Sequence, residues 1–247
     1  MNSPIEIYNN DEYVGNRTHM HFKCRVLHHM GDALTVVNAA RSSFNKSHEM
    51  FEETSDTKLL HYLAKHEHTM PWRHLHIMIQ MRVPEVVARQ IFRHLVGIEI
   101  TSVESFKDVA WSEMSGRYVA YNETYIPENF HHQHQSRKQG ASDVVHEKSK
   151  LFYEKSSTLI EQLMSLYNEM IDDGVAREEA RCILPMGLYT EFSWTPSLLA
   201  LAHFVRLRSK VEAQAEIRDV ADVIHNFAVN RFGVAYTILY SYMDKEQ

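Results

Sequence analysis

The feature that most constrains the fold of this chain is a strictly alternating run at residues 74–82, HLHIMIQMR. Apolar side chains occupy every second position, namely Leu75, Ile77, Ile79 and Met81, and polar or long side chains occupy the positions between them. Successive side chains of a strand point to opposite faces of a sheet. The run therefore predicts a β-strand with one buried face.

A helix is predicted directly after this strand. Pro84 suits the first helical turn, where its missing N–H costs no hydrogen bond, and EVVARQIFRHL continues the pattern. Gln90, Arg93 and His94 are spaced i, i+3 and i+4, so we expect them on one helix face. Before this strand, we predict a β-like run at 21–29, a short helix capped by Asp32 that runs through residues 39–44, and a helix after Ser55-Asp56. After it, we predict a mobile surface loop at 122–140 and an amphipathic helix from about Ser142 to a stop at Gly174. The last predicted elements are a short helix with Arg181, a helix opened by Thr195-Pro196, and a helix at about 211–231 that stops at Gly233.

This balance of elements predicts an α+β fold: a helix-rich chain with a modest, mostly antiparallel sheet. Because no repeat or flexible linker interrupts it, we expect one domain over residues 1–247. The formal charge of −6 argues against nucleic acid or an anionic membrane as the main partner. The sequence has only two cysteines, and it has no apolar leader and no apolar stretch long enough to span a membrane. We therefore expect a cytoplasmic protein.

Known motif patterns exclude several classes of enzyme. The sequence has no G-x-G-x-x-G, P-loop, G-x-S-x-G or H-E-x-x-H pattern. What remains is a group of arginines near small polar residues: Arg89, Arg93, Arg117, Arg181, Arg206 and Arg208. A guanidinium binds phosphate and carbonyl oxygens through two hydrogen bonds, so inward-pointing arginines would form an anion site. The alternative, that they decorate solvated helix faces, is weakest for Arg117 in SGRY and for Arg181 among apolar neighbours.

Six segments in sequence order carry a specific pattern: AARSSF (39–44), HTMPWRH (68–74), VARQIFRH (87–94), SEMSGRY (112–118), ARCILPMGLYTEFSWT (180–195) and LRSKVEAQAEIR (207–218). Together they resemble the flavin-dependent thymidylate synthase family over about residues 30–230. The resemblance implies reductive methylation of dUMP to dTMP, with FAD as cofactor and with 5,10-methylenetetrahydrofolate and NADPH as co-substrates. It also implies a homotetramer whose sites are shared between subunits, and no metal site.

The resemblance assigns roles to individual residues. Arg208 would be catalytic, because it matches the arginine that favours ionisation of uracil at N3 and so activates C5. The implied dUMP-binding residues are Gln90, Arg93, Glu113, Ser115, Gly116, Arg117, Arg181 and Arg208. The implied FAD-binding residues are Ser43, Met70, Arg93, His94, Leu95, Glu113, Ser197, Leu199 and His203.

The chain departs from the family pattern mainly on the flavin side. Leu95 stands where a second arginine is usual, and a longer segment at 96–111 follows it. Losing an arginine beside a diphosphate costs roughly 1.5–3 kcal/mol unless another cation compensates. Arg73 and Lys107 are candidates for that role. The other departures are Ser112 for asparagine, Arg73 for glutamate, His203 for asparagine and Glu212 for histidine.

Other interpretations stay open at this point. Within the same fold, the enzyme would be a methylase or hydroxymethylase of another uridylate such as UMP. In a different class, it would be a metal-dependent hydrolase using the histidines His66, His68, His74 and His76. A third alternative is a non-catalytic relative that binds the nucleotide without flavin. Cys182 as a nucleophile is disfavoured, because it lies in an apolar segment where cysteine is usually inert.

Overall fold

The alternating run lies within the sheet of the computed structural model, which describes residues 7–8, 11–17, 20–94, 110–136 and 140–243. It forms strand β4 (His76–Pro84), and all four apolar side chains of the run, from Leu75 to Met81, are fully buried. The predicted half-buried strand is confirmed. It begins at His76, because His74 still belongs to the 3-10 helix η2 (Met70–His74), which contains a proline in its first turn.

Strand β4 pairs with a neighbour on each side in a six-stranded sheet. The order is β1 (Ile7–Tyr8), β2 (Glu12–Arg17), β3 (Met20–Met30), β4, β8 (Tyr189–Trp194) and β5 (Trp111–Glu113). Every neighbouring pair is antiparallel, which confirms the α+β class. On β3, Met20, Phe22 and Cys24 are fully buried and alternate with more exposed positions, so this strand presents one face to the core.

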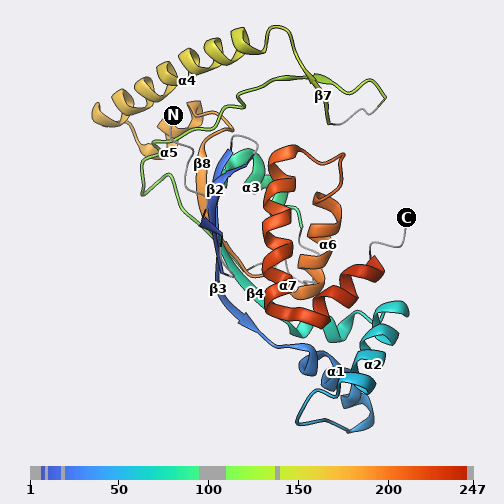
Figure 1. Cartoon of the computed structure of the whole chain (residues 1–247). Helices are drawn as coiled ribbons and strands as arrows, with labels where there is room; N and C mark the ends of the chain where they lie inside the picture. Colours follow the sequence, from blue (N-terminus) through green and yellow to red (C-terminus); the bar gives the residue numbers. More distant parts are fainter. Residues whose placement is uncertain (1–6, 9–10, 18–19, 95–109, 137–139, 244–247) are drawn as a thin grey trace, which may run out of the picture.

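Helices complete the core. They are α1 (Ala33–Arg41), η1 (Ser42–Phe44), α2 (Glu53–Lys65), η2, α3 (Glu85–Phe92), α4 (Ser149–Asp172), α5 (Arg177–Ala180), η3 (Arg181–Ile183), α6 (Leu198–Arg208) and α7 (Ala215–Met243). Helices α6 and α7 lie against the sheet, and α1 and α2 lie at one end (Figure 1). The Asp32 cap is confirmed, since its side chain accepts a hydrogen bond from the backbone N of Thr35 at 2.9 Å. Across the described ranges, no helix combines the length and apolar character that a membrane span requires.

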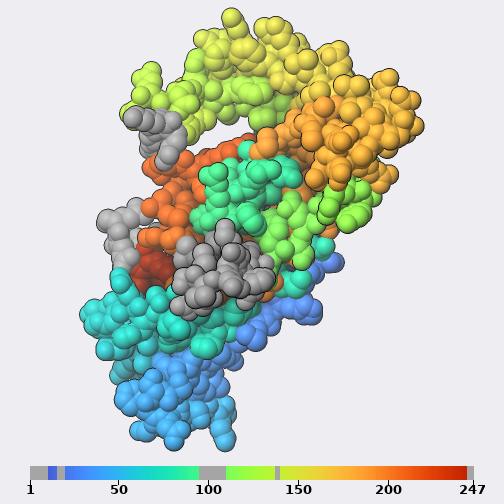
Figure 2. Space-filling model, turned by 180° about the vertical axis from the view of Figure 1, so that it is seen from behind, coloured from blue at the N-terminus to red at the C-terminus, as the bar shows by residue number. Residues whose placement is uncertain are grey.

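At the other end of the molecule, residues 130–136 and 140–172 form an arm. Its hairpin, β6 (His131–Gln133) and β7 (Ala141–Val145), precedes α4, and in the space-filling view the arm arches over an open hollow (Figures 1 and 2). The predicted loop at 122–140 is therefore confirmed for residues 122–130 and wrong at β6, and the predicted helix start near Ser142 is wrong. The β-branched pair Val144-Val145 favours a strand, and the helix begins only at Ser149.

The last helix also differs from its prediction. Gly174 ends α4 with φ of +90°, as expected, and the predicted stop at Gly233 is also present, but it is followed by a second helical stretch that was not predicted. Gly233 has φ of +49° and breaks the helical geometry, and the helix then resumes to Met243. It resumes because residues such as Tyr236 and Leu239 pack into the core. The glycine thus introduces a kink into one long segment.

Candidate active site

A cleft of about 480 Å³ opens between α3, β5 and the segment around Arg181. Three of the residues predicted to contact dUMP line it: Glu113, Ser115 and Arg181. The remaining lining residues are Glu85, Ala88, Arg89, Phe92, Trp111, Met114 and Tyr121. Two guanidiniums, a hydroxyl and several aromatic rings therefore share one concave surface. This combination suits an anionic ligand that carries a planar ring.

The carboxylate of Glu113 is held by two donors at the end of β5. Thr190 Oγ1 donates to Oε1 at 2.6 Å, and Trp111 Nε1 donates to Oε2 at 2.9 Å. The indole of Trp111 stacks on Phe192, with ring centroids 3.8 Å apart. These contacts fix the position of the carboxylate. Burial, and then the charge of Glu113, raise the pKa of Glu85 nearby.

The Ser115-Gly116-Arg117 turn passes close to Tyr121. A Cβ on Gly116 would lie 2.3 Å from the tyrosine ring, so only glycine fits here. The backbone N atoms of Tyr118 and Val119 both donate to Ser115 O, which closes the turn. Arg117 itself is exposed and lies over the Tyr118 ring, 5.5 Å from its centroid. It does not line the cleft, in contrast to Arg181.

Arg208 and His94 form a hydrogen-bonded pair at the end of α6. Arg208 Nε donates to His94 Nε2 at 2.8 Å, and the histidine is only 6% exposed. Burial, followed by the positive charge of Arg208 and the nearby His203, lowers the pKa of His94 to about 4. Burial and the charge of Arg93 lower the pKa of Arg208 as well. At neutral pH, a neutral imidazole therefore holds a charged guanidinium.

The predicted common face of Gln90, Arg93 and His94 is only partly present. Helix α3 ends at Phe92, so Arg93 is its exposed C-cap and His94 lies beyond it, buried. Gln90 Nε2 donates to Gln214 Oε1 at 2.8 Å, which ties α3 to the segment after Arg208. Its amide thus has a partner within the chain, and its predicted contact with the nucleotide stays untested.

A second, smaller cavity of about 240 Å³ lies between α2, α6 and α7. Leu199 and His203, both predicted to contact FAD, line it together with Trp72 and Tyr242. Burial and Arg206 lower the pKa of His203. Arg206 also borders the cavity, and its Nε is buried without a hydrogen-bond acceptor among the described residues. A buried guanidinium N–H beside apolar and aromatic walls fits an anionic, ring-containing cofactor such as a flavin dinucleotide.

The other residues predicted to contact FAD are dispersed. Ser43 is exposed on η1, and Met70, at the start of η2, is 63% exposed. Ser197 is the N-cap of α6, and its hydroxyl accepts from Ala200 N at 3.3 Å. Leu95, and with it nearly all of the longer segment at 96–111, lies outside the described residues.

Sequence reasoning missed several residues that shape the main cleft. Glu85, Phe92, Trp111 and Tyr121 line it, and Thr190 positions Glu113. One signal was available, because Glu85 precedes Arg89 by four residues and the two are 3.8 Å apart on α3. The aromatic residues gave no such signal, since an isolated tryptophan or tyrosine is typical of any core.

The histidines proposed as a hydrolase centre do not converge. His66 and His68 both contact the ring of Tyr62, while His76 is on β4 and His74 is exposed on η2. Cys182 is exposed, so the apolar residues beside it in the sequence do not bury it as a packing cysteine, and its Sγ donates to Glu178 O at 3.5 Å. Cys24 is the buried thiol, and burial raises its pKa. An inert Cys24 fits a packing role.

The fold of this chain, an antiparallel sheet packed against α6 and α7, is also found in a solved structure. The UMP/dUMP methylase PolB from Streptomyces cacaoi superimposes with a TM-score of 0.73 at 24% identity, over 89% of this chain and 95% of PolB, in its complex with 5-Br dUMP. Its complex with 5-Br UMP gives a TM-score of 0.74 at 22% identity, over 90% and 94% of the two chains.

The family follows from sequence comparison. The model of the thymidylate synthase complementing proteins matches residues 25–232. The flavin-dependent thymidylate synthase of Thermotoga neapolitana is 36% identical over 79% of this chain and 80% of its own length. That of Thermus thermophilus is 34% identical over 86% and 73%. The chain therefore belongs to the flavin-dependent thymidylate synthase family, and the resemblance seen in the sequence is confirmed.

Proposed function

We propose that this chain catalyses the reductive methylation of dUMP to dTMP, with FAD as cofactor and with 5,10-methylenetetrahydrofolate and NADPH as co-substrates. The observation that carries the proposal is Arg208 held at its Nε by neutral, buried His94. The names of the relatives support the activity, since they are flavin-dependent thymidylate synthases at 34–36% identity.

Arg208 supplies the activation of the pyrimidine. C5 of uracil is a weak nucleophile until negative charge develops on the ring, and a guanidinium near N3 stabilises that charge. Hydrogen bonding of Nε to His94 leaves the two terminal nitrogens of Arg208 to face the substrate. The imidazole accepts without adding positive or negative charge, so the guanidinium keeps its full charge for the ring.

The main cleft supplies the nucleotide site. Arg181 and Ser115 are placed to bind the phosphate, and Arg89 adds a third donor that the sequence assignment did not include. Trp111 and Tyr121 offer apolar walls to the planar base. Glu113 already accepts from Thr190 and Trp111, which partly neutralises its repulsion of a phosphate.

The second cavity is the proposed flavin site. Arg206 and His203 would bind the anionic part, and Leu199 and Trp72 would pack on the rings. When bound in reduced form, the flavin supplies the hydride that completes the methyl group. At about 240 Å³, the cavity is smaller than the roughly 300–1,000 Å³ of typical small-molecule sites. A single chain therefore forms only part of the FAD site.

That shortfall supports a homotetramer with shared sites. Arg117 faces outward from its own chain, where it would complete the site of a neighbouring subunit. Helix α4 exposes apolar side chains, with Leu159 at 60% and Leu166 at 45%, and the arm leaves a hollow that a second chain would fill (Figure 2). Both cysteines are free, which fits the cytoplasm, and the charge of −6 fits small-molecule rather than nucleic-acid substrates.

UMP is the main competing substrate, because PolB, which shares the fold, is a UMP/dUMP methylase. The deciding experiment records the absorption spectrum of the purified protein and then measures NADPH oxidation and product formation with dUMP and with UMP. We expect a flavin spectrum, oxidation stimulated by dUMP, and dTMP as product. Faster turnover of UMP than of dUMP would identify UMP as the substrate. Binding of dUMP without oxidation of NADPH would indicate a non-catalytic relative.

A further inference from the structure

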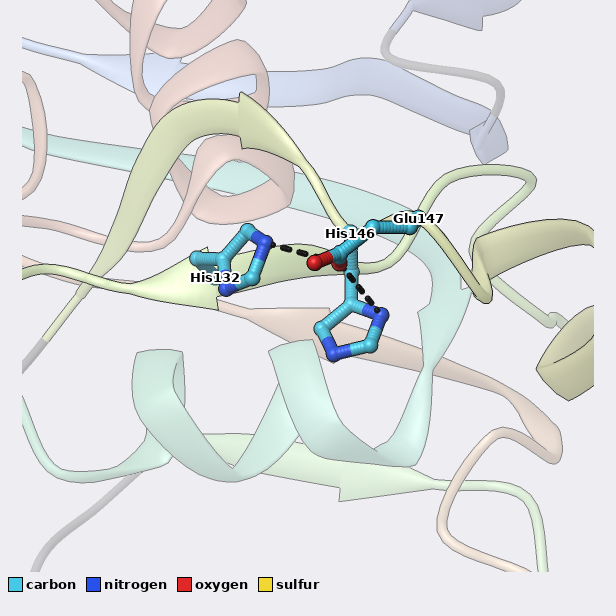
Figure 3. A group of neighbouring side chains, drawn as sticks. All are labelled: His132, His146 and Glu147. Carbon is cyan, nitrogen blue, oxygen red and sulfur yellow. Dashed lines mark ion pairs between the residues drawn. The ribbon is translucent and has the colours of Figure 1, made fainter.

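Two histidines and a glutamate converge where the hairpin meets α4. His132 lies in the middle of β6, and His146 and Glu147 follow β7 directly. Figure 3 shows the three side chains pointing toward one another. The cluster is on the arm, and the proposed methylation uses none of its members. Among the described residues it is the group of potential metal ligands whose donor atoms all lie within 4.8 Å of each other.

The distances between these atoms suit a small tetrahedral ion. Glu147 Oε2 lies 3.1 Å from His132 Nε2 and 3.3 Å from His146 Nδ1. Zinc bonds to nitrogen and oxygen of about 2.0–2.1 Å place tetrahedral ligand atoms roughly 3.3 Å apart. The imidazole rings stack with their centroids 4.5 Å apart, so the two histidines lie side by side next to the carboxylate.

The hydrogen bonds around His146 leave one of these contacts unexplained without a cation. The backbone N of Lys148 donates to His146 Nδ1 at 3.0 Å, so this nitrogen carries a lone pair and no proton. It cannot then donate to Glu147, and two acceptor atoms face each other at 3.3 Å. A proton on His132 Nε2 would account for the first contact but not for this one. A cation among the three atoms accounts for both.

We propose that His132, His146 and Glu147 bind one divalent first-row transition metal ion of the zinc class, with water as fourth ligand. Two imidazoles and one carboxylate suit zinc, whereas calcium and magnesium prefer oxygen ligands alone. The ion would take the lone pair of His146 Nδ1 in place of the backbone N–H of Lys148, a residue that is exposed. This site departs from the family resemblance, which implied none.

The ion would act as a structural clamp on the arm. It joins β6 to the start of α4, a junction where Phe130 N already donates to Ser149 Oγ at 2.8 Å. At the far end of the hairpin, the Cβ position of Gly140 lies 3.5 Å from the carbonyl oxygen of Glu212. A fixed hairpin therefore also fixes its contact with the segment that follows Arg208.

The test is calorimetric titration of Zn²⁺ into the full-length protein after treatment with EDTA. We expect one Zn²⁺ per chain and a rise in melting temperature, both lost in the His132→Ala/His146→Ala double variant. His131→Ala is the matched control, because this neighbouring residue is exposed on β6 and is not in the cluster. The control is needed because the chain has 17 histidines, and histidines outside the cluster also offer imidazole nitrogens to Zn²⁺.

Glu147→Gln keeps the shape of the side chain and removes its charge. If the double variant fails to fold, this variant tests whether the cluster binds Zn²⁺. Weaker Zn²⁺ binding in Glu147→Gln supports the site. Unchanged binding in Glu147→Gln or in a folded double variant, or no uptake by the wild-type protein, would overturn it. None of these readouts depends on methylation, so the proposed function is tested separately.

Discussion

The Nε of Arg208 donates to Nε2 of His94 across 2.8 Å, and the two residues lie 114 positions apart in the chain. Arg208 ends α6, and His94 follows α3, so the contact joins the ends of two helices, although neither residue lines the main cleft. The aromatic ring of Phe204 packs edge-on against the imidazole with centroids 5.1 Å apart. The orientation of the guanidinium is therefore set by a residue that is itself held by packing.

Replacing Arg208 by alanine should abolish methylation and leave the assembly folded. Loss of one preorganised group that stabilises developing charge typically lowers kcat by about 100- to 1,000-fold. Stopped assays of dTMP formation would measure kcat, and size-exclusion chromatography would check assembly. Arg208→Lys is the control that keeps the charge but loses the Nε donor. Near-normal turnover in Arg208→Ala would show that another residue activates the pyrimidine.

The depressed pKa of His94 predicts a pH dependence of stability. Its pKa is about 4 in the folded chain and 6.5 for an ordinary histidine, so the unfolded chain binds more protons between these values. Above about pH 6.5, His94 therefore does not lower the free energy of unfolding. As the pH falls toward 4, protonation of His94 in the unfolded chain lowers this free energy by at most about 3 kcal/mol. Urea denaturation from pH 4 to 7 would show a flatter profile for His94→Gln, which keeps an acceptor that does not titrate. Identical slopes in both proteins would contradict the assignment.

Gly116→Ala should displace the turn that carries Ser115 and Arg117. The added carbon would lie 2.3 Å from the ring of Tyr121, and overpacking of this kind costs about 1–3 kcal/mol. We expect a lower melting temperature and weaker dUMP binding by calorimetry. Adding Tyr121→Leu should recover most of the lost stability, because it removes the clashing ring. No recovery would mean that the cost arises in the backbone.

Shared sites predict complementation between two inactive variants. If Arg117 and Arg208 of one site come from different chains, co-expressed Arg117→Ala and Arg208→Ala subunits should regain up to about a quarter of wild-type activity, because random mixing leaves that share of sites intact. Each variant alone, co-expressed with an untagged copy of itself, is the matched control. Activity of the mixture at the level of these controls would place both arginines in the same chain.

The sequence predicted most reliably what depends on periodicity. The alternation from Leu75 to Met81 identified β4, and Asp32 as a helix cap identified the start of α1. The hairpin of the arm was missed because β6 is only three residues long and its polar residues resemble a loop. The helix after Gly233 was missed because one glycine gives the same signal for a kink as for a stop.

The site was predicted less completely, because its residues meet only in three dimensions. Glu113, Ser115 and Arg181 were assigned through the family pattern and do share a cleft. The bond between His94 and Arg208 could not be foreseen, since nothing local indicates that residues 114 positions apart will touch. Arg117 lies outside the cleft of its own chain, because its side chain is exposed and lies over the ring of Tyr118.

The kink at Gly233 separates α7 into two parts that pack in different places. Residues before it, such as Phe227, belong to the core beneath the sheet, whereas Leu239, Tyr242 and Met243 after it form one wall of the smaller cavity. A straight helix would carry these three side chains away from His203 and Arg206. This wall of the proposed cofactor site therefore depends on Gly233, where the backbone leaves helical geometry and the chain changes direction.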